Sequence, residues 1–255
     1  KIKLVVRKIW KKTKRILWIL FLSSLIYTIL CRWVMPPVTM TQIANAFGYG
    51  LKRDYISWNQ INYSVKLAAI ASEDQVFPDH SGFDWDAIEK SIKPKKKNKK
   101  TRIPLGGGAS TITQQTAKNV FLWQGGSITK FIRKIPELYF TVLIEWVWGK
   151  QRILEVYLNV IEMGPGIFGI QAASRHYIKK DASQLTRAEA AMIIASLPNP
   201  KKFLVKPKAV TIVFLFFATV SIATRFIKIA GCKQNVIAFV SEELAFESEA
   251  VFDVA

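Results

Sequence analysis

An uncharged apolar run near the N-terminus constrains this chain more than any other feature. Residues 16–31, ILWILFLSSLIYTILC, carry no charged side chain, and about 20 such residues are needed to cross the hydrocarbon core of a bilayer. Residues 33–35 complete that length if the side chain of Arg32 extends to the lipid headgroups. We therefore expect a transmembrane anchor over residues 16–35.

The charges on either side of this run predict how the anchor is oriented. Residues 1–15 carry eight Lys or Arg, and the first acidic residue of the chain is Asp54. By the positive-inside rule, the basic segment stays in the cytoplasm and the chain after the anchor is translocated. A cleaved signal peptide is the main alternative, although no small-x-small cleavage site follows the run. A lipoprotein is a poorer alternative, because Leu30 precedes Cys31 where a lipoprotein has a small residue. The predicted location is the cytoplasmic (inner) membrane, crossed once, with the domain on the periplasmic or extracytoplasmic side.

The overall charge narrows the choice of partners. The chain has 37 Lys and Arg against 18 Asp and Glu, a net charge of +19. Such a surface suits either nucleic acid or anionic lipid. Because an anchored and translocated domain meets lipid phosphates, we expect a membrane partner and no nucleic acid. The two cysteines, Cys31 in the anchor and Cys232 in the tail, supply neither a disulfide framework nor a metal cluster.

Helical patterns dominate the chain after the anchor, without internal repeats or a series of alternating strands. Ser64 is the expected N-cap of a helix that ends before Pro78, which leaves Glu73 and Asp74 in its last turn or just beyond. Further helices are expected in three segments: 137–148, ELYFTVLIEWVW; 150–164, KQRILEVYLNVIEMG; and 185–200, LTRAEAAMIIASLPNP. The first of them is apolar almost all round, so it lies either in the core or against a membrane. The third begins with a Thr186/Glu189 capping box.

Acidic groups are concentrated in residues 72–84, SEDQVFPDHSGFD. Glu73 follows the apolar face of LAAIAS, where partial burial would raise its pKa and make it a usable base near neutral pH. The alternative is an ordinary glutamate at the end of a helix. His80 lacks a second histidine nearby for a metal site, so we expect it, with Asp84, to shape the turn after the helix.

A glycine-rich turn before STITQQTAKN indicates an anion site. It is not a P-loop, because no G-K-[ST] triplet is present. Glycines that open a helix bearing Ser110, Thr111 and Lys118 can nevertheless offer N–H groups, hydroxyls and a cation to a phosphate. Gln114 and Lys118 stand four residues apart on one helical face.

Five segments of the chain together resemble one enzyme family. In chain order they read SEDQVFPDHSGFDW, GGGASTITQQTAKNVFLW, RKIPE, KQRILEVYLNVIEMG and LTRAEAAMIIASLPNP. Their order and approximate spacing resemble the five signature blocks of the peptidoglycan glycosyltransferases, the family 51 domains of bifunctional penicillin-binding proteins. Because one anchor precedes one such domain, the chain most resembles the monofunctional members. The resemblance covers residues 36–203.

This resemblance implies a mainly α, lysozyme-like domain that polymerises lipid II, a disaccharide-pentapeptide on undecaprenyl pyrophosphate. Glu73 matches the first-block glutamate, and its implied role is the general base that removes the proton from the 4-hydroxyl of the acceptor GlcNAc. That oxygen attacks C1 of the donor MurNAc with inversion and expels undecaprenyl pyrophosphate. Glu137 matches the third-block glutamate, with the implied role of positioning the pyrophosphate or a divalent cation. Because it follows Pro136, we expect Glu137 to begin a helix.

The chemistry of the leaving group supports a cationic site. Pyrophosphate leaves readily, so the enzyme needs cations and N–H donors and not the neutral carboxylic acid of a glycosidase. The expected substrate-binding residues are Ser110, Thr111, Gln114, Lys118, Asn119, Lys130, Arg133 and Lys134. The resemblance allows a divalent cation, Mg²⁺ or Mn²⁺, without fixing its ligands, and implies no organic cofactor. The expected partners are lipid II, undecaprenyl-pyrophosphate-linked glycan, the membrane, and other cell-wall synthesis and division proteins.

Two departures from the family pattern keep other functions open. Lys130 stands near the position where relatives have an arginine, and it lacks the bidentate guanidinium. The tail, residues 204–255, is apolar and then acidic where relatives have a short basic helix; it is either a membrane-associated helix or an altered C-terminus. The alternative functions are a lysozyme-like lytic enzyme that cleaves glycan and a catalytically silent, anchored scaffold.

Overall fold

A computed structural model describes residues 2–92, 110–123, 129–203 and 205. The basic run at 93–102 and, apart from residue 205, the tail lie outside the described residues. Within them the helices are α1 (Ile2–Leu30), α2 (Met40–Tyr49), α3 (Tyr63–Glu73), α4 (Trp85–Ile92), α5 (Ile112–Phe121), α6 (Thr129–Val160), α7 (Ile170–Ala173) and α8 (Arg187–Ile194). The strands are β1 (Lys52–Arg53), β2 (Glu162–Gly164) and β3 (Ile167–Phe168), and short helical turns lie at Trp58–Gln60, Ser174–Ile178 and Ala182–Gln184.

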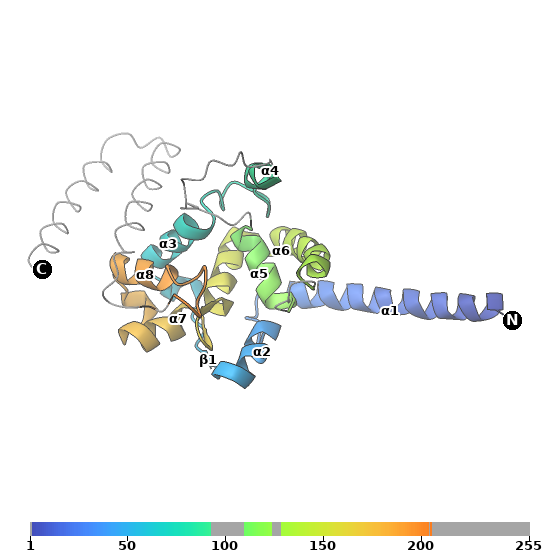
Figure 1. Ribbon diagram of the computed structural model, residues 1–255, viewed down its shortest axis with the longest axis horizontal. Coiled ribbons are helices and arrows are strands. Elements are labelled where there is room, and N and C mark those ends of the chain that lie inside the picture. Colours follow the sequence, from blue (N-terminus) through green and yellow to red (C-terminus); the bar gives the residue numbers. More distant parts are fainter. Residues whose placement is uncertain (1, 93–109, 124–128, 204, 206–255) are drawn as a thin grey trace, which may run out of the picture.

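The domain is built around the pair α5 and α6, and α1 extends away from it (Figure 1). The helix α3 packs against α8 on the side remote from α1. A small sheet in the order β1-β3-β2 lies at one edge, with β1 parallel and β2 antiparallel to β3. The expected mainly α fold is confirmed. The sheet was not expected from the sequence, because its strands are only two or three residues long and show no alternation.

Helix boundaries follow local capping chemistry, with one correction at α3. The side chain of Asn62 accepts a hydrogen bond from the N–H of Ser64, so Asn62 and not Ser64 is the N-cap. The helix ends at Glu73 with Asp74 as its C-cap, as expected. The Thr186/Glu189 capping box at α8 is confirmed.

The long helix α6 corrects the expectation for Glu137. It begins at Thr129, so Pro136 and Glu137 lie inside it and not at its start. A proline inside a helix removes one backbone donor and is tolerated when neighbouring packing holds the helix. Gly149 then breaks α6 with φ 73° and ψ 164°, which separates the two helical segments expected on either side of it. A left-handed φ of this kind suits glycine and disfavours residues with a Cβ.

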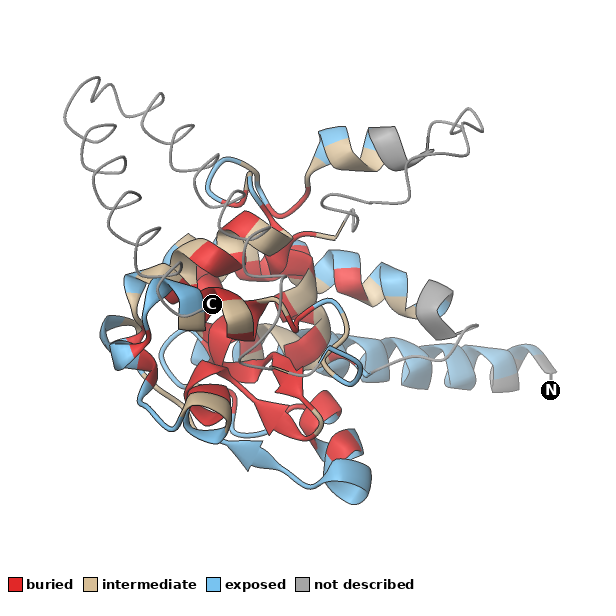
Figure 2. Cartoon of the chain, turned by 60° about the vertical axis from the view of Figure 1, so that its left-hand side comes forward, coloured by how far each residue is buried: buried red, intermediate tan, exposed pale blue. Residues whose placement is uncertain are grey.

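The second half of α6 forms the centre of the core. Figure 2 shows buried residues concentrated there and around the sheet, while α1 is exposed along most of its length. The largest fully buried side chains include Tyr157, Ile153, Leu158, Phe168 and Ile112. Glu155 and Asn159, on the other side of this helix, bind the backbone at Trp58 and Ile56 and so have a structural role.

The end of α1 is part of the domain. The Nε1 of Trp148 donates to the carbonyl of Thr28 at 2.7 Å, and the guanidinium of Arg152 donates to the carbonyl of Cys31 at 3.0 and 3.1 Å. Cys31 is buried in the core, and α1 ends at Leu30. Helix α1 therefore stops short of residues 33–35, the end of the expected anchor: residues 31–33 form a turn, and Arg152 holds the carbonyl of Cys31 just after the helix. That residues 33–35 belong to the membrane-crossing segment stays a prediction.

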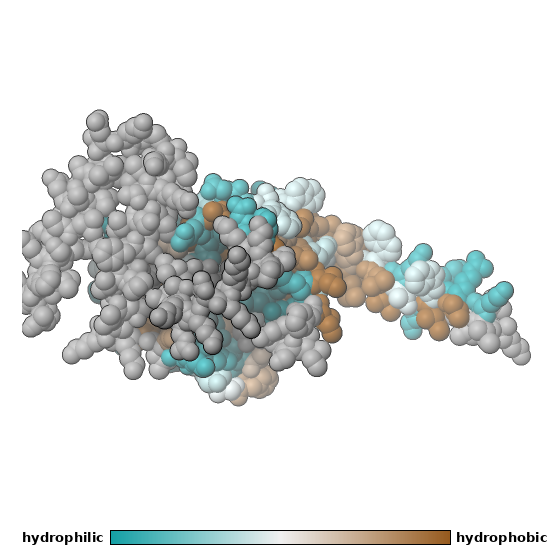
Figure 3. Space-filling view, turned by 45° about the horizontal axis from the view of Figure 1, so that its top comes forward, coloured by the Kyte–Doolittle hydropathy of each residue, from teal (hydrophilic) through white to brown (hydrophobic). Residues whose placement is uncertain are grey.

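One side of α6 exposes a stripe of apolar residues next to α1. The stripe consists of Ile132, Ile135, Leu138, Val142 and Trp146, of which Trp146 is 80% exposed. Beside it, the hydroxyls of Tyr139 and Ser24 are 2.9 Å apart, which brings this side of α6 against the apolar part of α1. Figure 3 shows hydrophobic side chains gathered on the middle of α1 and on the part of the domain that adjoins it. The core position expected for segment 137–148 is confirmed for its opposite side, where Ile144 and Trp148 are buried. Its position against a membrane stays a prediction.

Candidate active site

The two neighbouring carboxylates at the end of α3 have different surroundings. Oδ2 of the buried Asp74 accepts hydrogen bonds at 2.9 Å from the N–H of Ile112, which opens α5, and from Nε2 of His80. Nδ1 of His80 accepts the N–H of Gly82 at 2.9 Å, so its Nε2 carries the proton. Asp74 and His80 therefore fix the start of α5, and His80 holds its turn as expected.

Glu73 faces a cavity and is the better candidate for chemistry. Its Oε2 accepts one hydrogen bond at 2.9 Å, from Nε2 of Gln115 on α5. Burial raises the pKa of Glu73, as does the charge of Asp74, while the Gln115 hydrogen bond and the charge of Lys118 oppose this rise. A partly desolvated carboxylate with a raised pKa is a stronger base than an ordinary surface glutamate.

The capping box of α5 uses two of the expected substrate-binding residues. Oγ1 of Thr111 accepts the N–H of Gln114 and donates to the carbonyl of Gly82, and Oε1 of Gln114 accepts the N–H of Thr111. Gly82 has φ +88°, and a Cβ there would lie 2.9 Å from the side chain of Thr141, so this turn requires glycine. The polar atoms of Thr111 are thus occupied in fixing α5, and contact between Thr111 and substrate stays a prediction.

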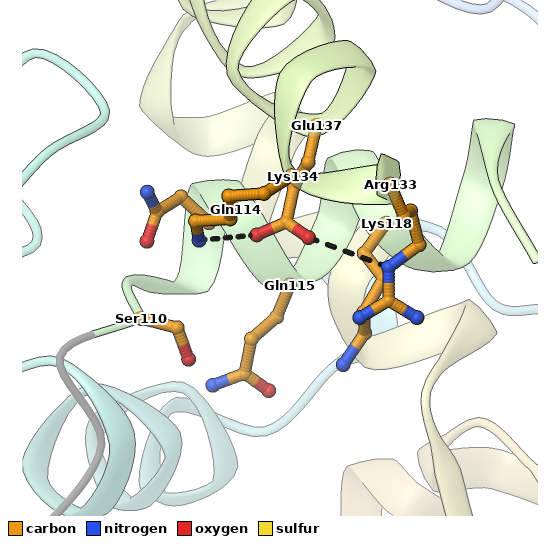
Figure 4. Close-up of a pocket in the computed structure, with 7 residues that line it drawn as sticks. All are labelled: Ser110, Gln114, Gln115, Lys118, Arg133, Lys134 and Glu137. Atoms are coloured by element: carbon orange, nitrogen blue, oxygen red, sulfur yellow. Dashed lines mark hydrogen bonds and ion pairs between the residues drawn. The ribbon is translucent and has the colours of Figure 1, made fainter. Parts of the chain in front are cut away.

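Cationic side chains surround Glu137 (Figure 4). Its Oε1 lies 2.7 Å from Nζ of Lys134 and its Oε2 lies 3.6 Å from Nε of Arg133. Lys118 reaches the same space from α5. Burial lowers the pKa of Lys118, and the neighbouring Arg133 lowers it further, against the opposing charges of Glu137 and Glu73. Cations gathered at this density, only partly neutralised by Glu137, favour binding of an anion.

Two adjoining cavities of about 430 Å³ each bring these groups together. The cationic cavity is lined by Ser110, Gln114, Gln115, Lys118, Arg133, Lys134 and Glu137. The Glu73 cavity is lined by Glu73, Ser110, Gln115, Lys118, Asn119, Ile161, Glu162, Leu197, Pro198, Asn199, Pro200 and Lys201. Because Ser110, Gln115 and Lys118 line both, a group bound in the cationic cavity lies next to one bound beside Glu73.

Most of the expected site residues converge on these cavities. Asn119 lines the Glu73 cavity, and its Nδ2 is buried without a hydrogen-bond partner among the described residues. Lys130 lies in the first turn of α6, but its side chain lies outside the described part of the structure. Sequence reasoning missed Gln115, although its i, i+3 spacing to Lys118 places both on one face.

The described residues do not by themselves fit a divalent cation. Mg²⁺ requires about six oxygen ligands in octahedral geometry. Glu137 offers one carboxylate, and both of its oxygens already face Lys134 and Arg133. Within the described ranges, no three His, Cys, Asp or Glu side chains are grouped so that they could hold a metal ion. No chemical step is therefore assigned to a metal.

A partly buried carboxylate beside a cation-lined cavity can take a proton from one substrate group while the cations stabilise negative charge on another, as a transferase with an anionic donor requires. Residues 40–212 match the sequence model of the transglycosylase family, and the chain belongs to this family, whose domain is lysozyme-like and helical.

Relatives called biosynthetic peptidoglycan transglycosylase are similar over most of the chain. The protein from Shewanella oneidensis is 46% identical over 193 residues, 74% of this chain and 79% of the relative. The one from Pseudomonas aeruginosa is 45% identical, over 74% of this chain and 81% of its own length. The one from Mannheimia succiniciproducens is 53% identical over 60% of each chain.

Proposed function

We propose that this transglycosylase polymerises peptidoglycan glycan chains from lipid II, with Glu73 as the general base. The family and the names of the relatives support the polymerising activity. The observation that carries the assignment of roles is the adjacency of the two cavities, which share Lys118 and place a partly desolvated carboxylate next to a cluster of cations. A transferase that joins a sugar hydroxyl to a pyrophosphate-linked sugar needs both groups side by side.

The reaction follows from this arrangement. The acceptor sugar binds in the Glu73 cavity, and the carboxylate of Glu73 takes the proton of its 4-hydroxyl. The freed oxygen forms a bond to C1 of the donor while the bond from C1 to the pyrophosphate oxygen breaks, with inversion. Lys118, Arg133 and Lys134 stabilise the negative charge that develops on the leaving pyrophosphate, and Glu137 holds Arg133 and Lys134 toward it.

The alternative of a lytic enzyme fits these cavities less well. Glycan cleavage requires an acid that protonates a poor alkoxide leaving group. Both oxygens of Glu137, the second carboxylate, lie against Lys134 and Arg133. Neither oxygen is therefore directed at a glycosidic oxygen that it could protonate.

Glu73→Gln tests the assignment, because it keeps the shape and removes the base. We expect the rate of polymerisation of labelled lipid II to fall by about 10²- to 10⁴-fold, with unchanged circular dichroism and binding of lipid II. The products are identified by digestion with a muramidase. Asp86→Asn, an exposed change in the first turn of α4, is the matched control and should retain full activity. A Glu73→Gln enzyme with more than about half of the normal turnover would exclude Glu73 as the base.

The stripe on α6 supports a membrane position for the domain. Ser24 precedes the end of α1 by about 9 Å along the helix axis, given a rise of 1.5 Å per residue. Its contact with Tyr139 therefore brings α6 to the depth of the lipid tails beside the anchor. In this proposal α1 crosses the inner membrane once with residues 1–15 in the cytoplasm. Arg133 and Lys134 lie on the same helix as the stripe, so they can reach the pyrophosphate of a substrate whose chain stays in the bilayer.

Further protein partners and a divalent cation belong to the same proposal. Other proteins of cell-wall synthesis and division would meet the domain on the outer side of the membrane. A divalent cation would need oxygens from the substrate pyrophosphate in addition to Glu137, because the residues that the structure describes supply too few ligands.

A further inference from the structure

Tyr157 is a buried polar residue that the mechanism above does not use. It lies in the second half of α6, and its side chain is fully buried. Its hydroxyl donates to Oε1 of Gln115 at 3.3 Å, and Nε2 of the same Gln115 donates to Oε2 of Glu73 at 2.9 Å. A chain of two hydrogen bonds therefore runs from the core of the domain to the carboxylate that faces the cavity.

The direction of the Gln115 amide matters for the charge on Glu73. With its NH₂ group toward Glu73, the amide stabilises the ionised carboxylate, which can only accept hydrogen bonds. If the amide were turned over, its oxygen would face Glu73 and would stabilise the protonated carboxyl group, which can donate. A hydroxyl that donates to Oε1 from the opposite side favours the first arrangement. If the amide turned over, the hydroxyl could only accept from the NH₂ group, and its own buried proton would lose the acceptor that it has among the described residues.

We propose that Tyr157 is a positioning residue for the base: its hydroxyl holds the Gln115 amide with the NH₂ group toward Glu73 and so keeps Glu73 ionised. The proposal rests on the proposed role of Glu73. It adds a residue from the fourth sequence block, on α6, to a base located on α3, with Gln115 of α5 between them.

Several other charged groups act on Glu73 and are unchanged by removal of this hydroxyl. Lys118 on α5 and Asp74 next to Glu73 have opposing effects on its ionisation. Glu162 and Lys201 line the same cavity from β2 and from the segment after α8. Because Tyr157→Phe leaves all four in place and is nearly isosteric, a changed titration of the enzyme reports on the hydrogen bond itself.

The test is the pH dependence of kcat/KM for lipid II polymerisation by the full-length protein. In Tyr157→Phe the Gln115 amide can turn when Glu73 is protonated, so the protonated form gains stability. We expect the acid limb to move to higher pH by about 0.5 to 1 unit, a three- to tenfold loss of rate on that limb, with a plateau near the wild-type value. An acid limb at the wild-type position would overturn the proposal.

Two further variants keep the test decisive. Gln115→Leu removes both hydrogen bonds and should move the acid limb in the same direction, and Tyr157→Phe should then add nothing in the double variant. Additive shifts would contradict the proposal. Tyr177→Phe, which removes a half-buried hydroxyl outside both cavities, controls for general loss of a tyrosine and should leave the limb in place. If Tyr157→Phe lost the circular dichroism signal of the folded protein, the hydroxyl would be required for folding, and this result would also overturn the proposal.

The outcome separates this proposal from the function on which it rests. If Glu73→Gln is inactive at every pH while Tyr157→Phe keeps the wild-type profile, Glu73 is the base and only the role of Tyr157 is wrong. If Glu73→Gln remains active, the assignment of the base itself fails.

Discussion

Lys118 is the side chain on which both cavities depend. Its ammonium lies between Glu73 and the Arg133/Lys134 pair, and burial lowers its pKa below the ordinary value of 10.5. Because the site needs this group protonated, kcat/KM should decline on the alkaline side at a pH below 10.5. We expect Lys118→Arg to move that decline to higher pH, since a guanidinium stays protonated, and Lys118→Met to lower the rate by about 10²- to 10³-fold.

Lys134 provides the matched comparison for this prediction. It lines only the cationic cavity, its side chain is 49% exposed, and it already pairs with Glu137. Lys134→Met should therefore cost less activity than Lys118→Met, and Lys134→Arg should leave the alkaline decline unchanged. Equal losses of activity in Lys118→Met and Lys134→Met would show that the position of Lys118 at both cavities does not account for its importance.

Single residues were predicted from the sequence where a local pattern marked them. Glu73 stood out because an apolar helical face precedes it, and Lys118 because it follows hydroxyl groups at the start of a helix. Gln115 and Tyr157 gave no such signal: a glutamine in a polar helix and a tyrosine among apolar residues look ordinary. Their connection exists only through packing of α3, α5 and α6 against one another.

At the scale of elements, the start of α5 is held by Asp74. Its carboxylate accepts the N–H of Ile112, while Thr111 completes the cap. Asp74→Ala should lower the free energy of unfolding by about 1 to 3 kcal/mol and should also reduce activity, because α5 carries Gln115 and Lys118. Thermal unfolding in detergent and the lipid II assay measure both effects.

Asp79, exposed in the following turn, is the control for this change. Asp79→Ala should alter neither the unfolding temperature nor the activity, whereas Asp74→Asn, which retains an acceptor oxygen, should be milder than Asp74→Ala. Equal effects of all three substitutions would show that the bond to α5 is unimportant.

The helices were largely predictable, and their boundaries less so. The apolar period and the capping residues predicted α3, α5, α8 and both halves of α6. The start of α6 was misplaced because Pro136 looked like a first-turn proline, whereas contacts within the folded domain tolerate it in the interior. The three short strands carry too few residues to show a period.

At the scale of the whole molecule, the stripe on α6 predicts how deeply the domain sits in the membrane. A nitroxide on Val142→Cys in full-length protein should be more accessible to oxygen than to a polar nickel chelate in lipid nanodiscs, because Val142 is exposed on the stripe and the proposed membrane position places the stripe against lipid. Cys232 is replaced beforehand, and Cys31, which is buried, does not take the label.

A label at Tyr63 gives the comparison. Tyr63 is 74% exposed and opens α3, on the side of the domain remote from α1 (Figure 1). This label should be accessible to the chelate. A chelate-accessible label at position 142 would place the stripe in water and would remove the support for an immersed domain.

The long apolar helix α1 was predictable from its uncharged run, but its union with the domain was not. Hydrogen bonds from Trp148 and Arg152 to carbonyl groups of Thr28 and Cys31 join segments about 120 residues apart, and sequence patterns of single helices carry no information on such pairs.

If α1 crosses the bilayer as proposed, this union fixes the two cavities at one height and one tilt relative to the plane of the bilayer. A substrate with its lipid chain in the bilayer then reaches Glu73 and Lys118 by lateral diffusion. Because the bilayer already orients its long axis along the membrane normal, rotation about that axis is the main orientational freedom that remains before it binds. The frequency of encounter is set by how many substrate molecules occupy each unit of membrane area. Adding inert lipid to the membrane would thus lower the rate of polymerisation, whereas adding buffer to the sample would leave that rate unchanged.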